Sequence, residues 1–211
     1  NISDVFAATN ETPTVLIPAG EYTEQLYIPR SVVLLGAKHG INPNIPQFEN
    51  PDTEWEINPE RNQPDQETVL KNTVINVEPE GDKVVVIADG FTLGEKSGVA
   101  DKSKKENSYT TVSIENCISD NAGGGSYYSK ETGADAVMNT IFTVGNQDQT
   151  NSHKTTRIIN FRMEKHLTMM AFTGYYEHIT FDGCYFGNNG NFLFSNEVAA
   201  PKGLNFDFEM F

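Results

Sequence analysis

The chain has 211 residues, 37% of them hydrophobic, and its 15 Lys and Arg against 29 Asp and Glu give a formal net charge of −14. So acidic a surface repels phosphate backbones, which argues against a nucleic-acid partner, and no run of about 18 apolar residues is present to span a membrane. The low hydrophobic fraction favours an elongated repeat protein, in which each layer buries only a narrow column of side chains.

Short apolar runs of strand type recur along the chain, separated by clusters of Gly, Asn, Asp, Ser and Pro. In chain order the runs are 14–17, 25–28, 32–35, 74–77, 83–87, 111–114, 157–161 and 178–181. Helical periodicity is nearly absent, and runs of this length with such punctuation are typical of strands and turns. The pattern therefore predicts an all-β protein.

Aligning the later runs reveals a repeat of about two dozen residues. A Gly or Asn stands before a residue of buried type at Gly90, Asn116, Asn139, Asn160 and Gly183, with steps of 26, 23, 21 and 23 residues. Both residue types tolerate the positive φ of a sharp bend, and stacked Asn side chains can hydrogen-bond between layers. We therefore expect a right-handed parallel β-helix, a solenoid of about seven coils with long loop insertions, in which these five residues stack.

The residue after each bend is expected to point inward, which places Cys117 and Cys184 in one column, three layers apart. At about 4.8 Å per layer the two sulfurs would be roughly 14 Å apart, whereas a disulfide needs Cα atoms within about 7 Å. We therefore expect two free, buried thiols that act as small hydrophobes.

The first third of the chain resembles the opening of secreted, pectin-lyase-like β-helix proteins of the bacterial surface type. The resemblance is carried by residues 15–26 (VLIPAGEYTEQL), 31–37 (SVVLLGA), 40–44 (GINPN), 67–70 (ETVL) and 88–93 (ADGFTL). It covers residues 13 to about 93 closely and the rest by pattern. It implies the β-helix fold and no single activity, because this superfamily contains lyases, hydrolases, esterases, adhesins and phage tailspikes.

Two enzyme families within that resemblance are disfavoured by missing motifs. Residues 20–24 (GEYTE) also look like the first motif of pectin methylesterases, but the later motifs, with their paired aspartates, glutamines and arginine, are absent. The aspartate-rich and Gly-His-Gly motifs of polygalacturonases are absent too. Lys165 and Arg162 are the residue types of a lyase base and charge clamp, but the strand pattern places Arg162 at an outward position.

Segments that break the period are candidate binding loops, because loops on a rigid scaffold often carry function. The long insertion 38–66 contains Trp55, whose ring either stacks on a sugar or is buried when the loop folds back over a flank. Segment 94–109 ends at Tyr109, and segment 120–135 joins three glycines to Tyr127 and Tyr128. These four aromatic residues are the predicted ligand contacts. The lysines of 94–109, which offer contacts to an anionic polymer or a solvated loop, are Lys96, Lys102, Lys104 and Lys105.

Carboxylates gather in segment 120–135 and in the next irregular segment, 145–155. If these loops stack on one side, Asp120, Glu131, Asp135 and Asp148 converge, and carboxylate oxygens are the ligands that Ca²⁺ prefers. No local calcium motif is present. We therefore expect no cofactor, with Ca²⁺ at these four residues as the alternative.

Together these features predict a non-catalytic β-helix module of a secreted or cell-surface protein that binds a polysaccharide or a surface protein through its loops. One alternative is a polysaccharide lyase or glycoside hydrolase acting on an extracellular polysaccharide. Another is a structural component of a tailspike or surface layer. Residues 1–211 are expected to form one β-helix domain of a longer protein, because the chain starts without Met and ends in a strand-like run. Oligomeric state is not indicated.

Overall fold

The protein is built almost entirely from β-strands. A computed structural model describes residues 12–47, 55–95, 97–101, 103, 107–123, 125–129, 134–138, 153–164, 178–187 and 207–210. These residues form twenty strands and two short 3-10 helices, so the predicted all-β class is confirmed. Within them, no helix has the length and apolar character needed to cross a membrane.

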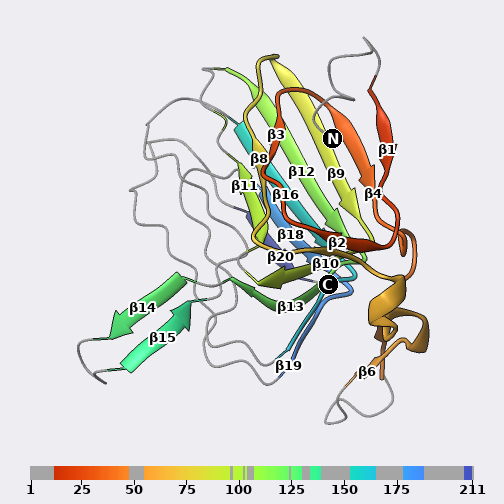
Figure 1. Cartoon of the computed structure of the whole chain (residues 1–211). Coiled ribbons are helices and arrows are strands. Elements are labelled where there is room, and N and C mark those ends of the chain that lie inside the picture. Colours follow the sequence, from red (N-terminus) through yellow and green to blue (C-terminus); the bar gives the residue numbers. More distant parts are fainter. Residues whose placement is uncertain are drawn as a thin grey trace.

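Three parallel sheets contain most of the strands (Figure 1). Sheet A comprises, in spatial order, β1 (Thr14–Leu16), β4 (Val32–Leu35), β9 (Lys83–Asp89), β12 (Tyr109–Glu115), β16 (His153–Ile159), β18 (His178–Asp182) and β20 (Asp207–Met210). Sheet B comprises β2 (Gly20–Tyr22), β7 (Thr68–Leu70), β10 (Phe91–Glu95), β13 (Ile118–Gly123), β17 (Arg162–Glu164) and β19 (Tyr185–Gly187). Sheet C comprises β3 (Leu26–Ile28), β8 (Val74–Val77) and β11 (Gly98–Asp101).

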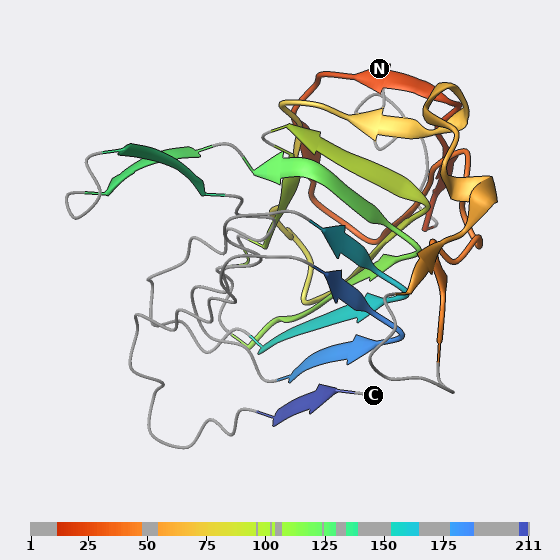
Figure 2. The same ribbon diagram turned by 90° about the horizontal axis from the view of Figure 1, so that it is seen from below.

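The chain visits the three sheets in turn. Strands β1, β2 and β3 belong to sheets A, B and C, β4 returns to sheet A, and β9, β10 and β11 repeat the order. Sequence order therefore becomes spatial order, with β1 at one end of sheet A and β20 at the other (Figure 2). Successive strands of one sheet lie in neighbouring layers of the molecule.

Strand register stacks like side chains into an apolar core. Val32 pairs with Val86, and Val86 with Val112, in one inward row of sheet A. These side chains are at most 2% exposed. β-branched side chains suit this pleated, buried surface, which explains why the Val- and Ile-rich runs form the strands.

The bends from sheet A to sheet B form a column, as expected. Gly90, Asn116, Asn160 and Gly183, here called the bend column, have positive φ values of 76°, 49°, 51° and 61°. The Asn160 Nδ2 donates to Asn116 Oδ1 at 3.0 Å, and the Asn116 Nδ2 donates to Asp89 Oδ1 at 2.8 Å. The predicted side-chain ladder is therefore present, and it ends on a carboxylate.

One predicted layer is wrong. Strand β12 pairs directly with β16, placing Asn116 beside Asn160, so no layer lies between them for Asn139, which itself falls outside the described residues. The even step near 23 residues was misleading because two coils are joined by a longer excursion. Cys117 and Cys184 are consequently two layers apart, not three, or about 10 Å. Both are free, but Cys184 is only half-buried.

The end of the interior opposite the bend column is polar. On β16 the Lys154 side chain points inward, is 1% exposed, and its Nζ donates to the backbone carbonyl of Asp101 at 3.3 Å. Burial lowers the pKa of Lys154, while the nearby Asp101 acts in the opposite direction. Asp101 Oδ2 and the hydroxyl of Thr110, which pairs with Lys154 in register, have no hydrogen-bond partner among the described residues.

The predicted insertion 38–66 separates β4 from β7. It contains the short antiparallel pair β5 (Asn44–Ile45) and β6 (Glu56–Ile57) and the 3-10 helices η1 (Pro59–Arg61) and η2 (Pro64–Gln66). Both 3-10 helices begin at Pro, whose fixed φ suits a first helical position. Figure 1 shows this segment lying against the ends of the sheets.

Candidate functional site

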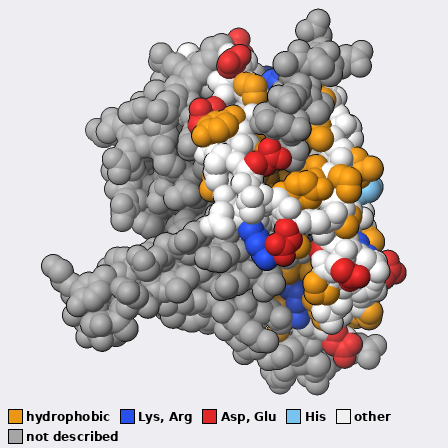
Figure 3. Space-filling view, in the orientation of Figure 1, with side chains coloured by type: hydrophobic (Ala, Val, Ile, Leu, Met, Phe, Trp, Pro, Cys, Tyr) orange, Lys and Arg blue, Asp and Glu red, His pale blue; other side chains and the backbone are white. Residues whose placement is uncertain are grey.

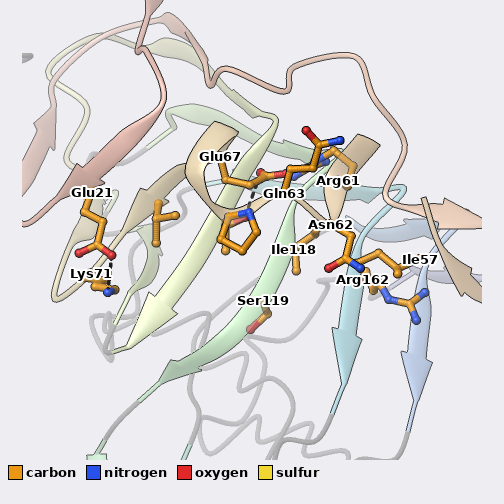
Figure 4. Close-up of a pocket in the computed structure, with 13 residues that line it drawn as sticks. Glu21, Ile57, Arg61, Asn62, Gln63, Glu67, Lys71, Ile118, Ser119 and Arg162 are labelled. Carbon is orange, nitrogen blue, oxygen red and sulfur yellow. Dashed lines mark hydrogen bonds and ion pairs between the residues drawn. The ribbon is translucent and has the colours of Figure 1, made fainter. Parts of the chain in front are cut away.

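A groove runs between the insertion and the outer face of sheet B (Figure 4). Its volume is about 570 Å³, within the range of about 300–1,000 Å³ that is usual for small-ligand sites. The insertion and the residue after it supply one wall, consisting of Ile57, Arg61, Asn62, Gln63, Pro64 and Glu67. Sheet B and its flanks supply the other residues, Glu21, Val69, Lys71, Thr92, Ile118, Ser119 and Arg162.

The groove is long because its sheet B residues come from five neighbouring strands. It extends from Glu21 on β2, through β7, β10 and β13, to Arg162 on β17. Four strand spacings of about 4.8 Å make this about 19 Å. Figure 4 shows Glu21 and Lys71 at one end, Arg162 and Ile57 at the other, and Ile118 and Ser119 between them. A groove of this shape suits a linear ligand better than a compact one.

A buried ion pair fixes the insertion wall. The Arg61 side chain is fully buried, and its Nε and Nη2 donate to the two carboxylate oxygens of Glu67 at 2.9 and 3.1 Å. Its Nη1 donates to the backbone carbonyls of Ile41 and Asn116. The Thr92 hydroxyl donates to Glu67 Oε2 at 3.1 Å. One arginine thus ties the insertion to the bend column, and the paired carboxylate ties it to sheet B.

A second anchor holds the far end of the insertion. The Asn44 Nδ2 donates to the backbone carbonyls of Phe161 and Gly183 at 3.2 and 3.1 Å. Arg162 donates to Asn44 Oδ1 at 3.3 Å and to the Trp55 carbonyl at 3.0 Å, and its guanidinium lies 4.5 Å from the centre of the Tyr185 ring. The groove wall is therefore attached at residues that come from coils far apart in sequence.

Polar groups suited to hydroxyls line the groove beside aliphatic ones. Asn62 is exposed and Gln63 half-buried, and Figure 4 shows both on the insertion side. An amide carries both donors and acceptors, which matches hydroxyl ligands. Ile57, Val69 and Ile118 add apolar surface. The described lining contains no aromatic ring.

The charges of the groove are largely compensated within it. Lys71 Nζ lies 2.6 Å from Glu21 Oε1, with 40% and 62% of these side chains exposed. Glu67 and Arg61 neutralise each other. In Figure 3 the described part of the surface shows acidic side chains spread among apolar and uncharged ones, with basic side chains close to acidic ones.

The two carboxylates that line the groove are poorly placed for acid–base chemistry. Glu67 is 3% exposed, and both of its oxygens accept hydrogen bonds from Arg61. Glu21 is held by Lys71. Glycoside cleavage needs one carboxyl group as acid and a second as base or nucleophile. The described lining does not offer such a pair.

Two of the predicted ligand contacts, Trp55 and Tyr109, are not among the residues that line this groove. Trp55 is half-buried, and its ring stacks on Tyr185 with centres 6.0 Å apart, so the loop folds back over a flank. Tyr109 is 54% exposed on the outer face of sheet A and stacks on His153 at 4.3 Å. The predicted role of both in ligand contact stays untested.

The other predicted site residues are described only in part. Tyr127 and Tyr128 lie in β14 (Gly125–Ser129), which pairs antiparallel with β15 (Ala134–Met138) in a hairpin that projects away from the sheets (Figure 1). Asp120 and Asp135 are placed by their backbone in β13 and β15. The side chains of these four residues, Glu131, Asp148 and the four lysines Lys96, Lys102, Lys104 and Lys105 lie outside the described part. Among described side chains, no group of three or more His, Cys, Asp or Glu could hold a metal ion.

Comparison with known proteins places the chain in no family. Neither family models, nor curated proteins, nor solved structures give a match. The geometry of the groove is therefore the main guide to function.

Proposed function

We propose that this chain is a right-handed parallel β-helix of the pectin-lyase-like type and a non-catalytic, glycan-binding module of a secreted or cell-surface protein. The fold part is supported by the repeated A, B, C order of parallel strands and by the positive-φ bend column. Seven strands in sheet A agree with about seven coils. Calcium has no role in this proposal.

The observation that carries the binding proposal is the groove across five strands of sheet B. Its central strands β7, β10 and β13 are each paired on both sides, so an extended peptide finds no open edge there to add a strand. A ligand meets side chains instead, chiefly amides, aliphatic groups and the exposed Glu21–Lys71 pair. This mixture suits the hydroxyl-rich and weakly apolar faces of a sugar chain.

Calorimetric titration with linear oligosaccharides of four to six units tests the proposal. We expect the double variant Asn62→Ala, Gln63→Ala to weaken binding about tenfold, the equivalent of losing one or two net hydrogen bonds. Thr111→Ala, on the outer face of sheet A, is the matched control and should bind normally. Binding of an extended peptide in place of sugar, or cleavage of the sugar chain, would overturn the proposal.

A further inference from the structure

We propose that the groove selects neutral glycans over acidic ones, and that Glu21 is the residue that sets this selectivity. This inference rests on the proposed glycan-binding function and adds the chemical class of the ligand. It starts from the three cations that line the groove, Arg61, Lys71 and Arg162.

Two of these cations are already used by the protein. The Arg61 side chain is fully buried: its Nε and Nη2 donate to Glu67, and its Nη1 donates to the backbone carbonyls of Ile41 and Asn116. Arg162 is 5% exposed and donates to Asn44 and to the Trp55 carbonyl. Arg61 would have to give up bonds that it already makes before it could hold the carboxylate of an acidic sugar, and Arg162 offers such a carboxylate little exposed surface. A buried group that loses its hydrogen-bond partner costs more free energy than a new hydrogen bond to the ligand contributes.

Lys71 is the one cation of the described lining with substantial exposure, and its partner is a carboxylate. Lys71 Nζ lies 2.6 Å from Glu21 Oε1, and 62% of the Glu21 side chain is exposed. The carboxylate of an acidic sugar that approaches Lys71 therefore meets Glu21 at the same place. The chain as a whole adds a formal charge of −14, which further disfavours an anionic polymer.

A neutral sugar meets no such conflict. The Lys71 ammonium donates hydrogen bonds and the Glu21 carboxylate accepts them, so the pair offers both to hydroxyl groups without separating. Asn62 and Gln63 repeat this combination on the opposite wall. Selectivity then arises from the repulsive element, Glu21, as much as from the attractive ones.

The test compares neutral and uronic-acid oligosaccharides of equal length on the wild type and on Glu21→Gln, which keeps the side-chain shape and removes the charge. We expect the wild type to prefer the neutral chain. Glu21→Gln should strengthen uronate binding about threefold to fivefold at low salt, an effect that about 0.5 M NaCl abolishes, and change neutral binding by less than about twofold. Asp182→Asn, with the same charge change on exposed sheet A surface, should leave both unchanged.

The outcomes separate the two proposals. A wild type that prefers uronates, or a Glu21→Gln variant that gains no more than Asp182→Asn, overturns the selectivity inference and leaves glycan binding intact. A wild type that binds neither kind of chain overturns the proposed function itself. Unfolding midpoints of both variants within about 2 °C of the wild type, as expected for exposed positions, show that the fold is retained.

Discussion

The bend column and the insertion touch each other, yet they reach their structures in opposite ways. Each bend residue acts locally: Gly90 and Gly183 adopt positive φ without steric cost, and Asn116 and Asn160 are the best substitutes. The insertion contains only short strands and 3-10 turns, so its position depends on distant partners such as the Asn116 carbonyl for Arg61. The conformational preferences of single residues therefore determine the bend column, whereas hydrogen bonds to residues distant in sequence determine the position of the insertion.

The largest expected effect comes from removing Arg61, the side chain that joins the insertion to the bend column. Arg61→Ala leaves the buried Glu67 carboxylate without its cation, and breaking a buried pair costs about 3–5 kcal/mol. Lys71→Ala removes the exposed pair with Glu21 and should cost at most about 1 kcal/mol. Urea unfolding of both variants measures the difference. Equal losses would show that the Arg61 pair does not anchor the insertion.

The next test replaces each of the two glycines of the bend column by alanine in turn. A Cβ at Gly90 would lie 2.1 Å from the backbone N of His39, which cannot give way without moving the insertion's first turn. A Cβ at Gly183 would lie 2.5 Å from Asn160 Oδ1, a side-chain atom that can rotate. Both alanines carry about 1–2 kcal/mol of left-handed strain. We expect Gly90→Ala to exceed Gly183→Ala by at least about 1 kcal/mol in chemical unfolding, and the reverse order would contradict this packing.

These two regions also show how much of the fold can be predicted from the sequence. The strand runs and four of the five bend residues were predicted from spacing and from the φ preferences of Gly and Asn. The predicted layer at Asn139 was wrong because β12 pairs directly with β16, and the spacing of Asn residues alone does not show which strands are adjacent. The shortest step, 19 residues from Thr14 to Val33, was not recognised because the first coil has no residue of the bend column type.

The candidate site was predicted only as a region. The insertion was singled out for its length and composition, but attention fell on Trp55, whose ring packs against Tyr185. Asn62 and Gln63 in the insertion and Lys71 after β7 have no local signature, since the insertion and the coils become neighbours only after the chain has folded. The order in which coils stack was therefore the missing information.

The polar end of sheet A, opposite the bend column, can be tested by measuring the free energy of unfolding at a series of pH values. Burial lowers the pKa of Lys154 below its ordinary value of 10.5, so the unfolded chain binds this proton more tightly than the folded one. The resulting penalty is complete below the folded pKa and disappears as pH rises to 10.5. Wild type should therefore gain stability relative to Lys154→Met as the pH rises from the folded pKa toward 10.5, by at most about 1.4 kcal/mol per pH unit. A constant difference would contradict a lowered pKa for Lys154.

The smallest expected effect compares the two cysteines that follow residues of the bend column. Cys117 and Cys184 each follow a bend residue, but Cys117 is 1% exposed and Cys184 half-buried. Burial raises their pKa values from 9.0 to about 12 and about 11. Because the thiolate is the reactive form, native alkylation at pH 8 should be slow at both and faster at Cys184, by about tenfold from pKa alone. Mass spectrometry after iodoacetamide measures each site, and denatured, unreduced protein should take up two labels. Faster native labelling of Cys117 would mean that the bend column opens at its centre before its end.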